Sequence, residues 1–430
     1  MSAAILVFLV ALPSAALAHS GEESYVYLDI YDDTVEGRVE YPIGDLNEVL
    51  SLDLPLEEEA AIAYAEANRQ LLHGYAAEHL GLEDASGEWP LVFDGFSVLE
   101  IGAAGSYLII DFTVDRVFDS VPREFTASYD GIFHAKSERS GLLIIGTDWG
   151  SGTFNNEASE LLRFAPGSTT ASVDLGDTSF WKGVGGVVDL GVEHIRIGTD
   201  HILFILALVL PSVLVFSRPE GWQAAPSFGS SLWRVLKIVT MFTIAHTITL
   251  TLGGLGIINL PGALVETVIA VSIALAALHN MRPVFVNREW LIAFGFGLFH
   301  GLGFAGLLSD LGLTQTRRLI SLLGFNIGIE LGQAVVILLV FPSLFLLRRT
   351  RFYLSTMYIA SGVLAVVAMG WALDRALGIN LNVDGLVDRV ILWPRSLVFV
   401  AILAALAVGA LYVERDRGRL LPVAGDSGTD

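Results

Sequence analysis

Six ionisable side chains lie inside long apolar stretches in the second half of this chain, where burying a charge or an imidazole among lipid tails is costly. They comprise three histidines and three carboxylates: Asp200, His201, His246, Glu266, His300 and Glu330. Imidazole and carboxylate groups are typical ligands of divalent transition metals. We therefore interpret this set as a metal site for Ni, Co, Zn or Cu, and we keep a proton relay and purely structural hydrogen bonding as alternatives.

The first of these stretches is preceded by a seventh candidate ligand, His194. His194 and His201 are seven residues apart and share one helical stripe, with Gly198 between them. On a straight helix they would be separated by ~10.5 Å, which is too far for one ion. The glycine leaves space on that stripe for an ion or a water. Asp200 is expected to orient His201 or to supply a carboxylate oxygen.

Uncharged polar residues accompany His246 and Glu330 on their stretches. They form an expected polar pathway that consists of Thr243, Thr247, Asn326 and Gln333. By position along the stretches, we expect Asp200, His201 and Glu266 in the outer half of the membrane. His246, His300 and Glu330 are expected near mid-depth, so the set predicts a path from the outside to the centre.

Seven stretches are long and apolar enough to position these residues as membrane spans, since crossing ~30 Å of hydrocarbon takes ~20 residues. They lie near 199–217, 235–258, 263–280, 290–309, 319–347, 355–373 and 396–413. If the first span starts outside, 11 Lys/Arg residues fall on the inner side and five on the outer side. This bias follows the positive-inside rule and predicts a bacterial inner-membrane protein with its N-terminal domain outside and its C-terminus in the cytoplasm.

The net charge of −21 is confined to the first half of the chain. Residues 19–190 hold 32 Asp/Glu against 8 Lys/Arg, a net of −24, whereas residues 191–430 carry +3. So acidic a region repels nucleic-acid phosphates, which argues against DNA or RNA as a partner. The absence of cysteine from the sequence excludes disulfides and thiolate ligands.

The N-terminal residues resemble a targeting segment, with an apolar run and an Ala-Leu-Ala cleavage site. We therefore expect a signal peptide over 1–18, an acidic extracytoplasmic domain over 19–180 and an amphipathic approach segment over 181–198. A seven-helix membrane domain over 199–413 and a cytoplasmic tail over 414–430 complete the expected organisation. Cleavage would expose His19, whose amino group and imidazole could form a second metal site.

Alternating polar and apolar residues predict a soluble domain of α+β or β-sandwich-like fold before the membrane domain. Strands are expected at Ser24–Ile30 and Val35–Tyr41 as a hairpin, and at Leu91–Phe93, Ser106–Val114, Glu124–Tyr129, Gly141–Thr147 and Thr170–Leu175. The segment Leu56–Leu80 is expected to be one helix. The spacing of His73 and His79 gives them no shared face, so both are interpreted as ordinary surface or packing residues, and His134 has no evident partner in the sequence.

Several of these segments resemble blocks of one membrane-protein family. HIRIGTDHILFILAL at 194–208 is similar to the His-x5-Asp-His pattern of the HupE/UreJ nickel/cobalt permeases, and GLFHGLGFAG at 297–306 to their Phe-His-Gly motif. AHTITL, VETVIAVSIA and FNIGIELGQ resemble the branch that carries an N-terminal extracytoplasmic domain. The resemblance implies metal transport, most plausibly of Ni²⁺, with His194, Asp200, His201 and His300 as the transferred residues.

One departure from the family pattern concerns the Phe-His-Gly motif, which in the better-known permeases continues with a second His and a Glu. Phe304 and Leu307 occupy those positions here. Two potential ligands are thereby lost, which weakens the assignment of nickel as the cargo. His246, Glu266 and Glu330 are candidates to replace them.

Three functions remain open from the sequence. The first is a Ni/Co-type permease that uses intramembrane His, Asp and Glu ligands. The second is an intramembrane metal-dependent hydrolase of Zn type, or a maturation factor, in which three histidines hold Zn²⁺ and a carboxylate acts as base. The third is a metal sensor or chaperone with His19 as its capture site. The expected partners are a metal ion, the lipid bilayer, and a periplasmic metal donor or a metalloenzyme under maturation.

Overall fold

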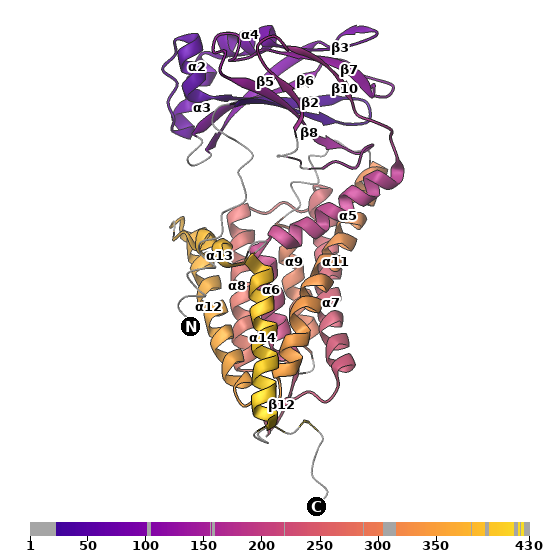
Figure 1. The fold of residues 1–430 in the computed structure, drawn as a ribbon, viewed down its shortest axis with the longest axis vertical. Helices are drawn as coiled ribbons and strands as arrows, with labels where there is room; N and C mark the ends of the chain where they lie inside the picture. Colours follow the sequence, from indigo (N-terminus) through magenta and orange to yellow (C-terminus); the bar gives the residue numbers. More distant parts are fainter. Residues whose placement is uncertain are drawn as a thin grey trace, which may run out of the picture. The chain divides into compact units, whose positions relative to one another are not determined.

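The computed structural model describes residues 23–424, except 101–104, 155, 157–159, 219, 287, 304–314, 380, 392–394, 417–419 and 422. These residues form two compact units. The N-terminal unit comprises described residues up to 187 together with 315–317, and the helical unit comprises those of 188–303 and 318–424. Figure 1 shows that the first unit is rich in sheet and the second consists mainly of helices.

Two sheets make up most of the N-terminal unit. The six-stranded sheet has the order β5-β6-β2-β1-β8-β9 and contains β1 (Glu23–Ile30), β2 (Val35–Pro42), β5 (Leu91–Glu100), β6 (Ser106–Val114), β8 (Ser140–Asp148) and β9 (Glu160–Phe164). The four-stranded sheet has the order β10-β7-β3-β4 and contains β3 (Leu80–Asp84), β4 (Gly87–Glu88), β7 (Glu124–Tyr129) and β10 (Thr170–Asp174). The predicted hairpin is confirmed by the antiparallel pairing of β1 with β2, and β1 also pairs with β8 in parallel.

Three helices, α2 (Ile43–Leu50), α3 (Glu58–Ala67) and α4 (Arg69–His79), share the core with inward-facing residues of both sheets. The sequence predicted a single helix over 56–80, and this prediction was wrong at Asn68. The Asn68 Nδ2 group donates to the Tyr64 carbonyl at 2.9 Å, and the Asn68 backbone leaves the helical region. A short amide side chain that competes for backbone partners favours such a break.

The helical unit begins with the end of α5 (Phe180–Ile197) and continues with α6 (Thr199–Ser212). A two-stranded hairpin follows, formed by β11 (Leu214–Ser217) and β12 (Gly221–Ala224). The remaining helices are α7 (Phe228–Gly254), α8 (Gly262–Met281), α9 (Glu289–His300), α11 (Gln315–Leu347), α12 (Tyr353–Leu377), α13 (Val383–Ile391) and α14 (Arg395–Asp416).

Five described helices, α7, α8, α11, α12 and α14, are long and apolar enough to cross a membrane. The pair α5–α6, bent by 74°, raises the number to six if it is counted as one span. The sequence predicted seven. The difference arises at α9, whose 12 residues cover ~18 Å of the ~30 Å hydrocarbon core. The predicted span continued to residue 309, beyond the described part of that segment.

The first predicted span, 199–217, was too long, because the helix ends at Ser212 and a strand begins at Leu214. Pro211 lies in the last turn and has no N–H group to bond to the carbonyl of Ala207. The buried Asn280 on α8 donates its Nδ2 group to that carbonyl at 2.8 Å. A side chain from another helix thus provides the hydrogen bond that the Ala207 carbonyl near the end of α6 cannot form within its own helix.

Glycines allow α9 to approach α7 closely. A Cβ atom added at Gly297 would lie 2.5 Å from the Phe242 carbonyl oxygen, and one added at Gly301 would lie 2.3 Å from that of His246. Small residues spaced by four are a common solution for close helix contacts in membranes. This contact brings His246 on α7 next to His300 at the end of α9.

Candidate metal centre

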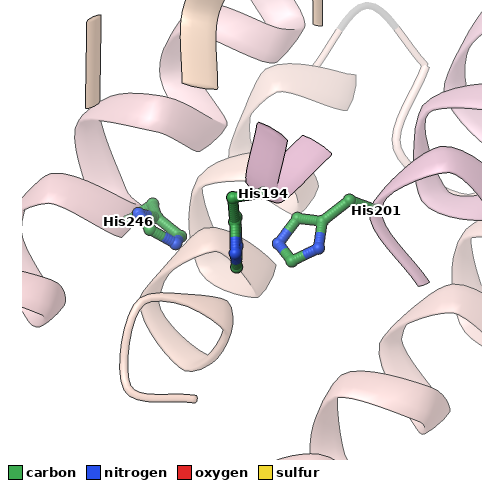
Figure 2. A group of neighbouring side chains, drawn as sticks. All are labelled: His194, His201 and His246. Carbon is green, nitrogen blue, oxygen red and sulfur yellow. The ribbon is translucent and has the colours of Figure 1, made fainter. Parts of the chain in front are cut away.

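Four histidines from four helices meet inside the helical unit: His194 from α5, His201 from α6, His246 from α7 and His300 from α9. Together with Asp200 they form two overlapping groups of three, in each of which one ligand atom per residue lies within 4.8 Å of the other two. The first group is His194, His201 and His246, and the second is Asp200, His201 and His300. His201 belongs to both. Figure 2 shows the imidazoles of the first group around a common space.

A sharp bend explains how His194 reaches His201. The sequence placed them too far apart on a straight helix, but α5 and α6 meet at 74° around Gly198. The ring centroids of the two histidines are therefore 4.5 Å apart. A Cβ atom at residue 198 would lie 2.6 Å from the His194 carbonyl oxygen and 2.8 Å from His201 Nδ1. The open space that the sequence predicted at Gly198 is therefore required for the bend, because a side chain at this position would collide with both histidine residues.

The imidazole of His246 is oriented by Asn326 on α11. His246 Nδ1 lies 3.1 Å from Asn326 Oδ1, while Asn326 Nδ2 donates to the Leu322 carbonyl at 2.7 Å. Because the amide group donates to Leu322, its oxygen faces the histidine and accepts. His246 Nδ1 therefore carries the proton, and the lone pair of the neutral ring lies on Nε2.

The imidazole of His300 is oriented by Ser272 on α8. The Ser272 hydroxyl donates its single proton to the Ile269 carbonyl at 2.6 Å. Its oxygen must therefore accept from His300 Nε2, which lies 3.0 Å away. The lone pair of the neutral His300 ring is thus on Nδ1.

Asp200 has the same role for His201, since its Oδ1 lies 3.0 Å from His201 Nδ1 and a carboxylate oxygen accepts. The Asp200 carboxylate therefore orients His201, which is the first of its two predicted roles. Because Asp200 also belongs to the second ligand group, its other predicted role, as a metal ligand, stays a prediction. Within the described part of the chain, no hydrogen-bond partner is found for His201 Nε2, His246 Nε2 or His300 Nδ1. Metal-binding histidines usually have such a partner, which fixes the tautomer and leaves the other ring nitrogen open for the ion.

The centre is buried among aromatic rings. His246 is fully buried, and His201 and His300 are 6% and 2% exposed. The ring centroids of Phe204 and Phe242 lie 5.2 Å and 5.0 Å from that of His300. In such surroundings, a buried imidazole nitrogen that has no hydrogen-bond partner is costly unless a cation binds it. The residues present therefore fit a transition-metal ion.

The predicted polar pathway forms a ladder between α7 and α11. Besides the bond from His246 to Asn326, Thr243 Oγ1 donates to Gln333 Oε1 at 3.0 Å and Thr240 Oγ1 donates to Glu330 Oε1. Thr247 donates to the carbonyl of Thr243 within α7. Glu330 belongs to neither histidine group, but it lies on the same ladder.

Glu266 is not brought to the histidines. It is exposed, and its Oε2 accepts from Arg375 Nε at 3.2 Å. The predicted separation of His201 from His246 and His300 was also wrong, because the packing of α6, α7 and α9 places their ring centroids 6.5 Å and 5.4 Å from that of His201. His19, Phe304 and Leu307 lie outside the described residues.

Two orienting residues were missed from the sequence, namely Ser272 and Thr240. Both interrupt apolar stretches, so polarity alone was a weak signal for them. Their roles became visible only when the helix neighbours were known, because a serine or threonine inside a helix usually bonds its own backbone.

Replacing Asn326 by leucine tests the orienting role of its amide group. The substitution keeps the volume but removes the acceptor of His246 Nδ1–H, so metal affinity is expected to fall about 10–100-fold with little loss of fold. Equilibrium dialysis of Co²⁺ against purified protein measures the change. Thr267→Val is the matched control, because the Thr267 hydroxyl bonds the backbone of its own helix. Equal affinities in both variants would contradict the orientation of His246.

Comparison with known proteins relates these residues to a family. Residues 170–375 match the family model described as HupE / UreJ protein. No curated protein and no solved structure matches the chain. The match covers the four histidines of the centre, their orienting residues and helices α5 to α12. Over residues 170–375, just under half of its length, the chain is similar to the HupE/UreJ protein family.

Proposed function

We propose that the protein is an integral membrane transporter of Ni/Co type whose cargo is a divalent transition metal. The observation that carries this proposal is the convergence of four histidines from four helices, three of them buried, with nitrogen lone pairs left open on His201, His246 and His300. The similarity to this family supports it, since the family suggests nickel or cobalt transport or metalloenzyme maturation.

The sharing of His201 favours transport over permanent storage. An ion held by His194, His201 and His246 keeps His201 as a ligand while it exchanges the other two for Asp200 and His300. Stepwise exchange avoids a state in which the ion has lost its whole coordination shell. Conduction requires such multiple sites of moderate strength. The ladder that includes Glu330 supplies further oxygen atoms beside this centre.

A metal-dependent hydrolase is the second candidate, favoured by the carboxylate of Asp200 beside histidines. Three imidazoles with one open position and a nearby carboxylate are the requirements of hydrolytic zinc chemistry. A bound ion would polarise a water there, and Asp200 would hold the proton at a carboxylate oxygen. A maturation factor or metal chaperone would use the same ligands to deliver the ion to a partner protein.

The proposed orientation has the N-terminal unit outside an inner membrane and the C-terminus in the cytoplasm. The distribution of positive residues, 11 against five, supports this placement. In that orientation the net charge of −24 over residues 19–190 attracts cations on the side from which they enter.

Metal flux into liposomes tests the proposed function. Purified protein reconstituted with an internal metal-sensitive dye is expected to admit Ni²⁺, Co²⁺ or Zn²⁺, with saturation at increasing external concentration. Protein-free liposomes and liposomes that contain the His201→Ala/His246→Ala variant are the controls. Tight retention of one equivalent without flux would overturn the transporter and favour the hydrolase.

A further inference from the structure

A second pair of histidines meets in the N-terminal unit. His79 is the last residue of α4, and His134 lies in the turn after β7. Their rings are stacked with centroids 4.1 Å apart and planes inclined by 17°. The pairing of Leu80 in β3 with Tyr129 in β7 brings these segments together, because it puts His79 beside Asp130.

Asp130 holds both rings in the same way. His79 Nδ1 lies 2.6 Å from Asp130 Oδ1, and His134 Nδ1 lies 3.2 Å from the Asp130 carbonyl oxygen. Both partners accept only, so each Nδ1 donates and each neutral ring has its lone pair on Nε2. Since the rings are nearly parallel and both Nδ1 atoms face one residue, both Nε2 atoms are directed away from Asp130 side by side.

Tyr75 fixes the turn that carries His134 by a hydrogen bond to its backbone. The Tyr75 hydroxyl accepts from the Ile132 N–H at 2.8 Å, and its ring lies 4.5 Å from that of His79. Burial raises the pKa of Tyr75 to about 12, so the phenol stays neutral at physiological pH. Ile132 has φ +67, a left-handed conformation that is strained for a β-branched residue. Strain that the surroundings maintain is often found at functional sites.

The pair is open to solvent on one side. His134 is exposed, and the His79 side chain is 12% exposed. The surrounding residues 19–190 carry a net charge of −24, which raises the local concentration of cations. Orienting partners, open nitrogens and an attractive field therefore occur together in a place to which an ion from solution has access.

We propose that His79 and His134 form a two-imidazole site for a divalent transition metal, with Asp130 as its orienting residue and water in the remaining positions. Tetrahedral coordination at 2.0–2.1 Å places two nitrogen atoms about 3.3 Å apart. The ring centroids are 4.1 Å apart and the planes are nearly parallel, so coordination requires the exposed His134 ring to turn out of the stack until its Nε2 lone pair meets that of His79. The site does not depend on the transport function of the helical unit.

The test uses the full chain in detergent with the other candidate sites removed. A background variant with His19→Ala, His201→Ala and His246→Ala excludes the terminal chelate and the membrane centre. Equilibrium dialysis is expected to find one bound Zn²⁺ per chain in this background, and the EPR spectrum of added Cu²⁺ is expected to show two coordinating nitrogens. His79→Gln and His134→Gln should each abolish that equivalent, whereas His73→Gln should retain it.

Asp130→Asn separates coordination from folding, because it keeps both imidazoles and removes the carboxylate. It is expected to weaken Zn²⁺ binding by about 10–100-fold. An equivalent that survives both His79→Gln and His134→Gln, or the absence of any bound Zn²⁺ in the background variant, would overturn the site. Absence of flux through the unaltered protein combined with a His79-dependent equivalent would overturn the transporter and leave this site standing.

Discussion

His201→Ala is expected to abolish metal binding at the membrane centre and to lower metal flux by about 100-fold or more. His201 is the one residue that belongs to both ligand groups, so its loss leaves two ligands in each. Removal of an orienting residue alone costs about 10–100-fold in affinity, and removal of a ligand costs at least as much. The intensity of the Co²⁺ visible spectrum measures the binding, and dye-filled liposomes measure the flux.

Variants of the other histidines provide the comparison for His201. His194→Ala and His300→Ala each affect one group and should retain part of the binding. His279→Gln is the matched control, because His279 Nε2 accepts from the Phe285 N–H after α8 and lies in neither group. If His201→Ala binds Co²⁺ as tightly as His279→Gln does, the shared centre is not the metal site.

Gly198→Ala is expected to reduce metal binding at least as much as His194→Ala does, although it keeps every ligand. Alanine tolerates the backbone angles of Gly198, φ −71 and ψ 91, so the effect does not arise from backbone strain. It arises because the added Cβ atom would lie 2.6 Å from the His194 carbonyl oxygen and 2.8 Å from His201 Nδ1. The bend must open to admit it, and His194 then moves away from His201.

Gly185→Ala is the control for this variant, since a Cβ atom at that position of α5 has no described heavy atom within 4 Å. Both substitutions remove a glycine, but Gly185 lies inside α5, where alanine favours helix by ~1 kcal/mol, and Gly198 is the N-cap of α6, where alanine is less favourable than glycine. Co²⁺ titration of the two variants measures the difference. Equal affinities would show that the bend does not position the ligands.

The histidines of the centre were predictable because a polar residue in an apolar stretch stands out in any sequence. His201, His246 and His300 are such residues, and all three meet in the structure. Their arrangement was not predictable, because the helical repeat assumes a straight axis. The bend at Gly198 broke that assumption for His194 and His201, and the packing of α6 against α7 and α9 placed His201 beside His246 and His300.

Glu266 shows the limit of the same reasoning. Its type and position matched those of a ligand, but Arg375, 109 residues later in the chain, lies beside it. An ion pair between distant segments depends on helix packing, which one sequence does not reveal. The His79–His134 pair could not be predicted for the same reason, because the β3–β7 pairing joins segments that are far apart in the sequence.

The strands of the N-terminal unit were predicted more successfully than its helices. Ser106–Val114 and Glu124–Tyr129 are confirmed as β6 and β7, because alternation of polar and apolar residues reports a half-buried strand directly. The short helix α2, which begins after Pro42, was missed, as were β3, β4 and β9. Short elements leave too few residues for a period to appear.

The carbonyl of Ala207 has a consequence for the biogenesis of the protein. Helix α6 is 14 residues long and covers about 21 Å, so it is too short to enter a bilayer as an independent unit. Entering alone, it would also expose to lipid the carbonyl that Pro211 leaves unbonded. The group that satisfies this carbonyl, Asn280, leaves the ribosome 73 residues later. The hydrogen bond to Ala207 can therefore form only after α8 is synthesised, and a nascent chain that stops before α8 also lacks Ser272 and His300 of the candidate centre.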